Sequence, residues 1–156
     1  TQLNRGMELS SQFNRFAHLP DHDRTEANLG ETVDQFCTLS ARFARLKKVG
    51  LTAAAPENSR IHLKANPIQL FMVLFLAMEA CLAGLSEHSS MEMAPDRKDD
   101  RPAVKIPCTG PENSNPEQFC NAVSKRPAWD QLESTLRQMD ARIDCNEEAA
   151  CVWILF

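Results

Sequence analysis

The sequence predicts a two-layer α/β sandwich in which a mixed sheet packs against about three helices, preceded by an N-terminal helix. Residues 67–85 form a helical segment that is apolar nearly all round, which is typical of a buried helix. Residues 141–145 and 150–156 have strand patterns on either side of an Asn-Glu-Glu turn, which predicts a closing hairpin. Helices interspersed with strands of this kind favour two packed layers.

The composition is that of one globular domain. The chain has 156 residues, of which 43% are hydrophobic and 24% charged, and a formal net charge of −4. This mild acidity argues against nucleic-acid binding, because phosphate contacts need an excess of Lys and Arg. The longest apolar run, from Leu70 to Met78, is far shorter than the about 20 residues of a membrane-spanning helix. We therefore expect a cytoplasmic domain in which this segment does not enter a membrane.

The N-terminal helix is predicted over residues 2–18 and ends before Pro20. The sequence begins without Met and without an apolar leader, so we expect residues upstream of it to be missing. An apolar stripe on an unpartnered helix usually marks an interface. We expect this helix either to mediate self-association as a homodimer or to pack on the body of the domain. The stripe consists of Leu3, Met7, Phe13 and Phe16.

A second helix is predicted from residue 29 to about residue 48. Asn28 and Glu31 form a plausible capping pair at its start, and Gly50 is well placed to end it. Its apolar face is expected to contain Leu29, Val33, Phe36, Leu39, Phe43 and Leu46.

Three strands are predicted in the middle of the chain, over residues 49–54, 61–65 and 103–108. Residues 88–101 are polar, charged and interrupted by Pro95, so we expect an exposed loop there; whether the loop over residues 86–102 is ordered stays open.

Two further helices are predicted before the closing hairpin. A short one opens at Asn115-Pro116 and runs through Val123, and an amphipathic one covers residues 129–139. The six cysteines include no CxxC pair, so we interpret them as small buried hydrophobic residues rather than disulfides or zinc ligands. The four histidines have no metal-binding spacing.

This order of elements resembles the C-terminal region of sensor histidine kinases. Residues 1–20, with LNRGMELSSQFNRFAHL, resemble the second helix of the dimerisation hairpin. Residues 26–156 resemble the ATP-binding domain of the gyrase/Hsp90/histidine-kinase type. Four segments carry this second likeness: ANLGETVDQFCTLSARFARLKKVGLTAAAP, KANPIQLFMVLFLAMEACLAGL, AVKIPCTGPE, and WDQLESTLRQMDARIDC with ACVWILF. The resemblance implies a role in two-component signal transduction.

The family's asparagine box resembles the segment Phe75-Leu76-Ala77-Met78-Glu79-Ala80. Glu79 stands where the family has its magnesium-binding asparagine, and Phe75 replaces the first asparagine of the box. A carboxylate can bind magnesium, so Glu79 is a candidate metal ligand. It also places a negative charge near the triphosphate, which costs about 4 kcal/mol at about 4 Å and an effective dielectric of about 20. The alternative is a carboxylate at the rim of a cleft, or one paired with Arg or Lys.

The family's Asp-x-Gly-x-Gly motif resembles the turn after residues 103–108. Cys108 stands where the family has the aspartate that accepts a hydrogen bond from adenine, and a thiol is a weak acceptor. Gly110 persists, but Glu112 replaces the next glycine. The later glycine-rich phosphate segment aligns with Arg126-Pro127-Ala128-Trp129, in which Pro127 has no N–H to offer phosphate.

These departures lead us to expect no cofactor in this chain. Phe75, Glu79, Cys108 and Gly110 remain the family's ATP-site positions, and Mg-ATP would bind there if the chain were a divergent kinase. Three function classes stay open. The chain is a histidine-kinase-like signalling or docking domain with a degenerate ATP pocket, a histidine phosphotransferase that uses this architecture without ATP, or an active but divergent kinase. The expected partner is a response regulator or the chain's own upstream kinase domains. No catalytic residue is assigned, because the phosphoacceptor histidine would lie on the missing first hairpin helix.

Overall fold

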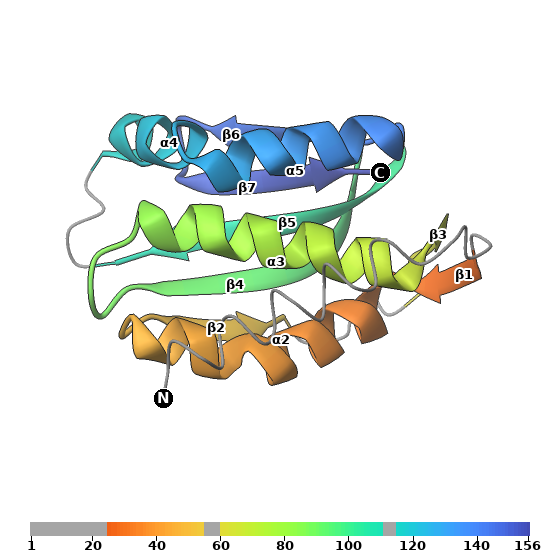
Figure 1. Cartoon of the computed structure of the whole chain (residues 1–156), viewed down its shortest axis with the longest axis horizontal. Coiled ribbons are helices and arrows are strands. Elements are labelled where there is room, and N and C mark those ends of the chain that lie inside the picture. The colour runs from red at the N-terminus through yellow and green to blue at the C-terminus, as the bar shows by residue number, and fades with distance from the viewer. Residues whose placement is uncertain (1–24, 55–59, 111–114) are drawn as a thin grey trace.

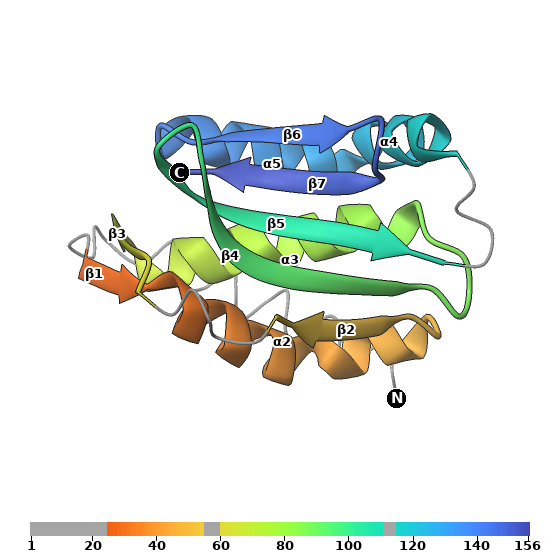
Figure 2. The same cartoon turned by 180° about the vertical axis from the view of Figure 1, so that it is seen from behind.

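The computed structural model describes residues 25–54, 60–110 and 115–156, and these form two layers. Figure 1 shows the helices in front of the sheet, and Figure 2 shows the uncovered face of the sheet from behind. The predicted two-layer α/β sandwich is confirmed; the helix expected over residues 2–18 lies outside the described residues. The elements are β1 (Thr25–Asn28), α2 (Leu29–Leu46), β2 (Gly50–Ala53), β3 (His62–Ala65), α3 (Pro67–Ala83), β4 (Ser90–Lys98), β5 (Arg101–Thr109), α4 (Pro116–Ser124), α5 (Pro127–Gln138), β6 (Arg142–Asn146) and β7 (Cys151–Leu155).

The main sheet has five strands in the order β2-β4-β5-β7-β6. Strands β2 and β4 are parallel, with Leu51 opposite Met91, whereas the other neighbours are antiparallel. β3 is not part of this sheet, contrary to the expectation for residues 61–65. It pairs with β1 in a separate two-stranded sheet, and the Leu29 N–H donates to the Ile61 carbonyl at 2.8 Å, which fixes the start of α2 beside it.

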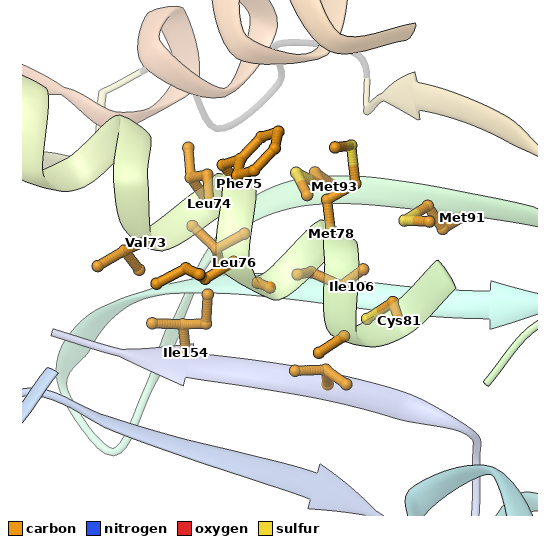
Figure 3. Packing of buried hydrophobic residues seen from close by; sticks show 14 of the residues in the cluster. Val73, Leu74, Phe75, Leu76, Met78, Cys81, Met91, Met93, Ile106 and Ile154 are labelled. Carbon is orange, nitrogen blue, oxygen red and sulfur yellow. The ribbon is translucent and has the colours of Figure 1, made fainter. Parts of the chain in front are cut away.

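The central helix α3 is buried as predicted. Asn66 caps its first turn by accepting a hydrogen bond from the Ile68 N–H at 3.0 Å, and Pro67 follows as the first helical residue. The sheet lies beneath α3, and α2 and α5 lie on either side of it (Figure 1), which explains why the helix has no polar face. Figure 3 shows its apolar side chains meeting Met93, Ile106 and Ile154 of the sheet. None of the described helices is long and apolar enough to cross a membrane.

Helix α2 begins as predicted, because the Asn28 side chain accepts a hydrogen bond from the Glu31 N–H at 3.1 Å. Its predicted apolar face was wrong at two positions: Leu39 is 70% exposed and Leu46 is 43% exposed. At about 100° per residue, the buried positions extend to one side of Leu29, whereas Leu39 and Leu46 lie about a quarter turn to the other side and so leave the buried face. The helix buries Leu29, Val33, Phe36, Cys37, Ser40 and Ala44 instead.

The end of α2 also differs from the expectation. The helix ends at Leu46, and Lys48 takes the left-handed conformation that reverses the chain, with φ 57°. Gly50 does not terminate the helix but begins β2. A lysine therefore occupies the position at which a glycine is most common.

The expectation of a loop over residues 88–101 was wrong, because this segment forms the nine-residue strand β4 and the turn after it. Met91, Met93 and Pro95 are buried, while the residues that alternate with them, mostly polar, are more exposed. Pro95 is tolerated because it lies beyond Met93, the last β4 residue that pairs with β2 in the described part. Asp99 and Asp100, with φ 54° and 59°, make the two-residue turn to β5, as a type I′ turn requires.

The tip of this β4–β5 hairpin lies across the face of the sheet that the helices leave uncovered. The Lys98 ammonium lies 4.6 Å from the centre of the Trp153 ring on β7, and Asp99 contacts Arg142 of β6 at 3.3 Å. Leu155 of β7 is on the sheet face opposite to the helices, because its neighbour Ile154 packs in the core. Cover by the hairpin tip on that face accounts for its lack of solvent exposure.

The other predicted strands and helices are confirmed, but the cysteines behave differently from the expectation. Cys120 of α4 and Cys145 of β6 form a disulfide with a Cα–Cα distance of 5.7 Å. The interpretation of all six as buried hydrophobic residues was therefore wrong for this pair, since a pattern in sequence does not show which distant residues meet. It holds for the four free cysteines, which are all buried: Cys37, Cys81, Cys108 and Cys151.

Candidate functional site

A cavity of about 270 Å³ lies where α2 and α3 end and α5 begins. Figure 1 shows these helices side by side over the sheet. Most of the lining is apolar, and three side chains in it are charged. The lining consists of Phe43, Lys47, Phe75, Met78, Glu79, Leu82, Ala83, Arg126, Pro127 and Ala128.

The aromatic wall of the cavity is made by Phe43 and Phe75. Their ring centres are 6.2 Å apart and the rings are nearly perpendicular, at 89°, which is the edge-to-face arrangement that aromatic pairs favour. Phe75 is only 7% exposed, and Figure 3 shows it leaving α3 beside Leu74. The residue that replaces the first asparagine of the family's box therefore supplies an apolar surface instead of an amide.

Glu79 lies at the rim of the cavity and is the only charged residue of α3. Although its side chain is exposed, the apolar surroundings raise the pKa of its carboxyl, and the nearby Lys47 partly opposes this by lowering it. Among the described residues, no direct ion pair involves Glu79, Lys47 or Arg126. The arrangement corresponds to a rim carboxylate with a lysine nearby.

Arg126 and Pro127 bring the start of α5 to the same cavity. Arg126 is the N-cap residue and makes no side-chain capping hydrogen bond, while Pro127 is the first helical residue. The Arg126 N–H donates to the Val123 carbonyl at 3.3 Å, which ties it directly to the end of α4. The positive end of the α5 dipole therefore lies at the cavity that Arg126 also lines.

Cys108 lies apart from this cavity, in the core under α3. It is 3% exposed, and its thiol donates weakly to the Ile106 carbonyl at 3.7 Å. A hydrogen bond with the Cys81 thiol, together with burial, raises the pKa of Cys108, so its sulfur stays a neutral thiol. This environment corresponds to a packed core residue rather than an adenine-binding group.

Gly110 also lies outside the residues that line the cavity. It follows β5, and a Cβ added to it would clash with the Ser89 side chain. A close approach of two chain segments therefore explains this glycine without a nucleotide. Of the four predicted ATP-site positions, the structure brings Phe75 and Glu79 into one cavity and leaves Cys108 and Gly110 apart from it.

Sequence reasoning did not assign Lys47 or Phe43 to the site, and it placed Arg126 there only through the segment that resembles the family's phosphate loop. Phe43 lies in the last turn of α2 and Lys47, four residues later, is its C-cap residue, so both reach the same side of the helix end, and this spacing was the available signal. In the parts of the chain that the structure describes, no three His, Cys, Asp or Glu side chains are grouped so that they could hold a metal ion. Glu79 is the single carboxylate of the cavity, and its role as a magnesium ligand stays a prediction.

Comparison with known proteins shows which known fold this chain shares. No protein-family model matches the sequence, and no curated protein is similar to it. Solved structures do match. The nucleotide-free catalytic domain of the histidine kinase ThkA superposes with a TM-score of 0.62 at 13% identity, covering 86% of this chain and 94% of that domain.

Two further structures extend the likeness over nearly the whole chain. The cytoplasmic segment of the histidine kinase QseC matches with a TM-score of 0.61 at 12% identity, covering 98% of this chain and 93% of that one. ThkA in complex with the response regulator TrrA matches with a TM-score of 0.64 at 15% identity, covering 99% of this chain and 47% of that one. The chain therefore has the fold of the histidine kinase catalytic domain, as the resemblance implied.

Proposed function

We propose that this chain acts in two-component signal transduction as a histidine-kinase-type domain with a degenerate nucleotide site. Its role is to dock a response regulator, or its own upstream kinase domains, rather than to bind Mg-ATP. The observation that carries the proposal is the cavity on α3. Where the family's asparagine box would present two amides, this cavity presents the Phe75 ring and the Glu79 carboxylate.

The adenine side of the site supports the proposal. Cys108 takes the place of the family's aspartate, and it is packed in the core against Cys81 with a raised pKa. A neutral, buried thiol offers the adenine amino group a poor acceptor. An unmet polar contact of this kind costs roughly 1–3 kcal/mol, which is about one to two orders of magnitude in affinity.

The phosphate side of the site points the same way. A triphosphate entering the cavity would lose water against the Phe43 and Phe75 rings, and moving charge into apolar surroundings is costly. Pro127 offers no N–H, and the ionised form of Glu79 offsets the charge that Lys47 would offer to phosphate. Among the described residues, Arg126 is therefore the one uncompensated cation of the cavity against the several negative charges of a triphosphate. The residues present therefore fit Mg-ATP poorly.

The docking role rests on the fold and on one of the comparisons. ThkA, which shares this fold, was solved in complex with the response regulator TrrA. Because separate sites can be carried by one fold, loss of the nucleotide site does not by itself remove a surface for a partner. The phosphotransferase alternative depends on a phosphoacceptor histidine in an upstream helix.

Calorimetry with Mg-ATP tests the nucleotide part of the proposal. We expect no binding heat at physiological ATP concentration, and partial recovery in the Phe75→Asn, Glu79→Asn double variant, which acts at the cavity wall. The matched control is Glu92→Gln, on the exposed side of β4. Micromolar binding by the unmodified chain would overturn the degenerate site and favour the divergent kinase.

A binding screen tests the docking part. The chain is immobilised, and the receiver domains of response regulators encoded beside its gene are passed over it, together with the kinase domains encoded upstream. We expect saturable binding to one of them in the absence of ATP. If none of these partners binds, the docking role is wrong even if the ATP site is degenerate.

A further inference from the structure

We propose that the cavity between α2, α3 and α5 binds a small organic monocarboxylate with an apolar body, such as an arylalkyl carboxylate. The inference rests on the proposed function, because a site that bound Mg-ATP would not be free for such a ligand. In this proposal the ligand's carboxylate pairs with Arg126, and its apolar body packs against the aromatic wall of the cavity.

The size and lining of the cavity select a small, largely apolar ligand. Its volume of about 270 Å³ falls just below the roughly 300–1,000 Å³ of pockets that take drug-sized molecules. Phe43 and Phe75 make one wall, and Met78 and Leu82 of α3 continue it. Met78 is unbranched and adapts its shape to what it contacts, so this wall suits a ring or a short hydrocarbon body.

The charges of the cavity select an anion. Lys47 and Glu79 both line the cavity and have opposite formal charges, which cancel in the sum, and the nearby Lys47 lowers the pKa of Glu79. Arg126 has no ion-pair partner among the residues that the structure describes, and this leaves the cavity with a net positive charge. A guanidinium matches a carboxylate with two parallel N–H donors, which gives a strong and geometrically specific pairing.

The start of α5 adds a second contribution at the same end of the cavity. Ala128 lines the cavity in the first turn of α5, where backbone N–H groups have no partner within the helix. The positive end of the helix dipole favours an anion there. Arg126 and Ala128 therefore act on the same carboxylate from side chain and backbone.

Other ligand classes fit these residues less well. An organic cation would meet Arg126 and Lys47 with the wrong sign of charge. A phosphate or a dicarboxylate would bring a second negative charge toward Glu79 and against the phenylalanine rings. A monocarboxylate satisfies Arg126 with a single charge and leaves its apolar part for the wall.

The probe for the test is 3-phenylpropionate, titrated into the full chain and followed by amide chemical shifts. We expect saturable shifts centred on Phe43, Glu79 and Ala128, and a dissociation constant raised about tenfold or more by Arg126→Gln, as expected for loss of a charged hydrogen bond. Lys125→Gln is the matched control. It removes the same charge one residue away, from a side chain that does not line the cavity, and should leave the affinity unchanged.

Three outcomes would overturn the inference: no saturation at millimolar probe, equal affinity in Arg126→Gln, or tighter binding of the matched cation 2-phenylethylamine. A parallel titration with Mg-ATP distinguishes failure of the carboxylate inference from failure of the proposed function. If neither ATP nor the carboxylate binds, only the inference is wrong. If ATP binds at micromolar concentration, the degenerate site is wrong, whether or not the probe also binds.

Discussion

Cys120 and Cys145 are joined by a disulfide that fastens the short helix α4 to strand β6. Helix α4 ends at Ser124, two residues before Arg126, and the Arg126 N–H donates to the carbonyl of Val123 in that helix. The cross-link therefore holds in place the segment that carries Arg126 to the cavity. Phe119 and Val123 of α4 also pack against the end of α3 at Gly84, where an added Cβ would clash with Val123.

Loss of this disulfide should destabilise the domain. A cross-link between residues 25 apart constrains the unfolded chain by about 3.5 kcal/mol in the chain-entropy description. We expect the Cys120→Ala, Cys145→Ala double variant to lose roughly that much in urea unfolding. A thiol reductant should lower the stability of the unmodified chain similarly and have little effect on the double variant. If the reductant leaves the unmodified chain unchanged, the two thiols are not joined in solution.

Truncation of the central helix should be far more costly than truncation of the exposed side of α2. Leu74 has no solvent exposure in the core, so Leu74→Ala should cost about 2–5 kcal/mol through lost burial and the cavity it leaves. Leu39→Ala removes the same atoms from a side chain that is 70% exposed and should change stability by about 0.5 kcal/mol or less. Similar losses in urea unfolding for both variants would contradict the burial of these two leucines.

The turn between β4 and β5 predicts opposite effects from two substitutions at one position. Asp100 has φ 59°, a conformation that glycine adopts freely and that branched side chains resist. Asp100→Gly should leave stability unchanged or raise it by a few tenths of a kcal/mol, whereas Asp100→Val should cost about 1–2 kcal/mol. Asp99 is left intact because it contacts Arg142. Thermal unfolding of both variants checks the prediction, and a more stable valine variant would rule out the type I′ turn.

Local signals in the sequence were sufficient for much of this fold. The apolar run of α3 with its Asn66-Pro67 start, the Asn28 cap of α2 and the closing hairpin each depend on neighbours in sequence, and all three are confirmed. Strand β4 was missed for a physical reason. It has one polar side and carries Pro95, so its Met91 and Met93 alternation was hidden among residues that usually mark a loop.

Local sequence patterns could not predict the contacts between segments that are distant in sequence. The pairing of β3 with β1 and the Cys120–Cys145 disulfide both join segments that are distant in sequence. For the site, the sequence singled out Phe75 and Glu79, which lie within one turn of a single helix. Lys47 and Arg126 reach the same cavity from other helices, so only the packing of α2 and α5 on α3 brings them there.

The raised pKa of Glu79 predicts how stability responds to pH. Because the folded state holds the Glu79 proton more tightly than the ordinary value of 4.5 implies, Glu79 contributes stability when protonated, and this contribution is lost as pH rises through its folded-state pKa. Glu79→Gln, which cannot ionise, should therefore be more stable than the unmodified chain at pH 7, by less than about 1 kcal/mol because the side chain is exposed. The difference should shrink as the pH is lowered toward 4.

Urea unfolding of the unmodified chain and of Glu79→Gln, measured from pH 4 to pH 7, tests this prediction. The Lys47→Gln variant provides a second test. Lys47 lowers the pKa of Glu79, so removing its charge should raise that pKa further and move the loss of stability to higher pH. In the Lys47→Gln, Glu79→Gln double variant, this added pH dependence should disappear, because no ionisable carboxyl remains at the cavity rim. If Glu79→Gln is instead less stable than the unmodified chain at pH 7, ionised Glu79 is held by a favourable partner and its attraction to Lys47 outweighs the cost of burial.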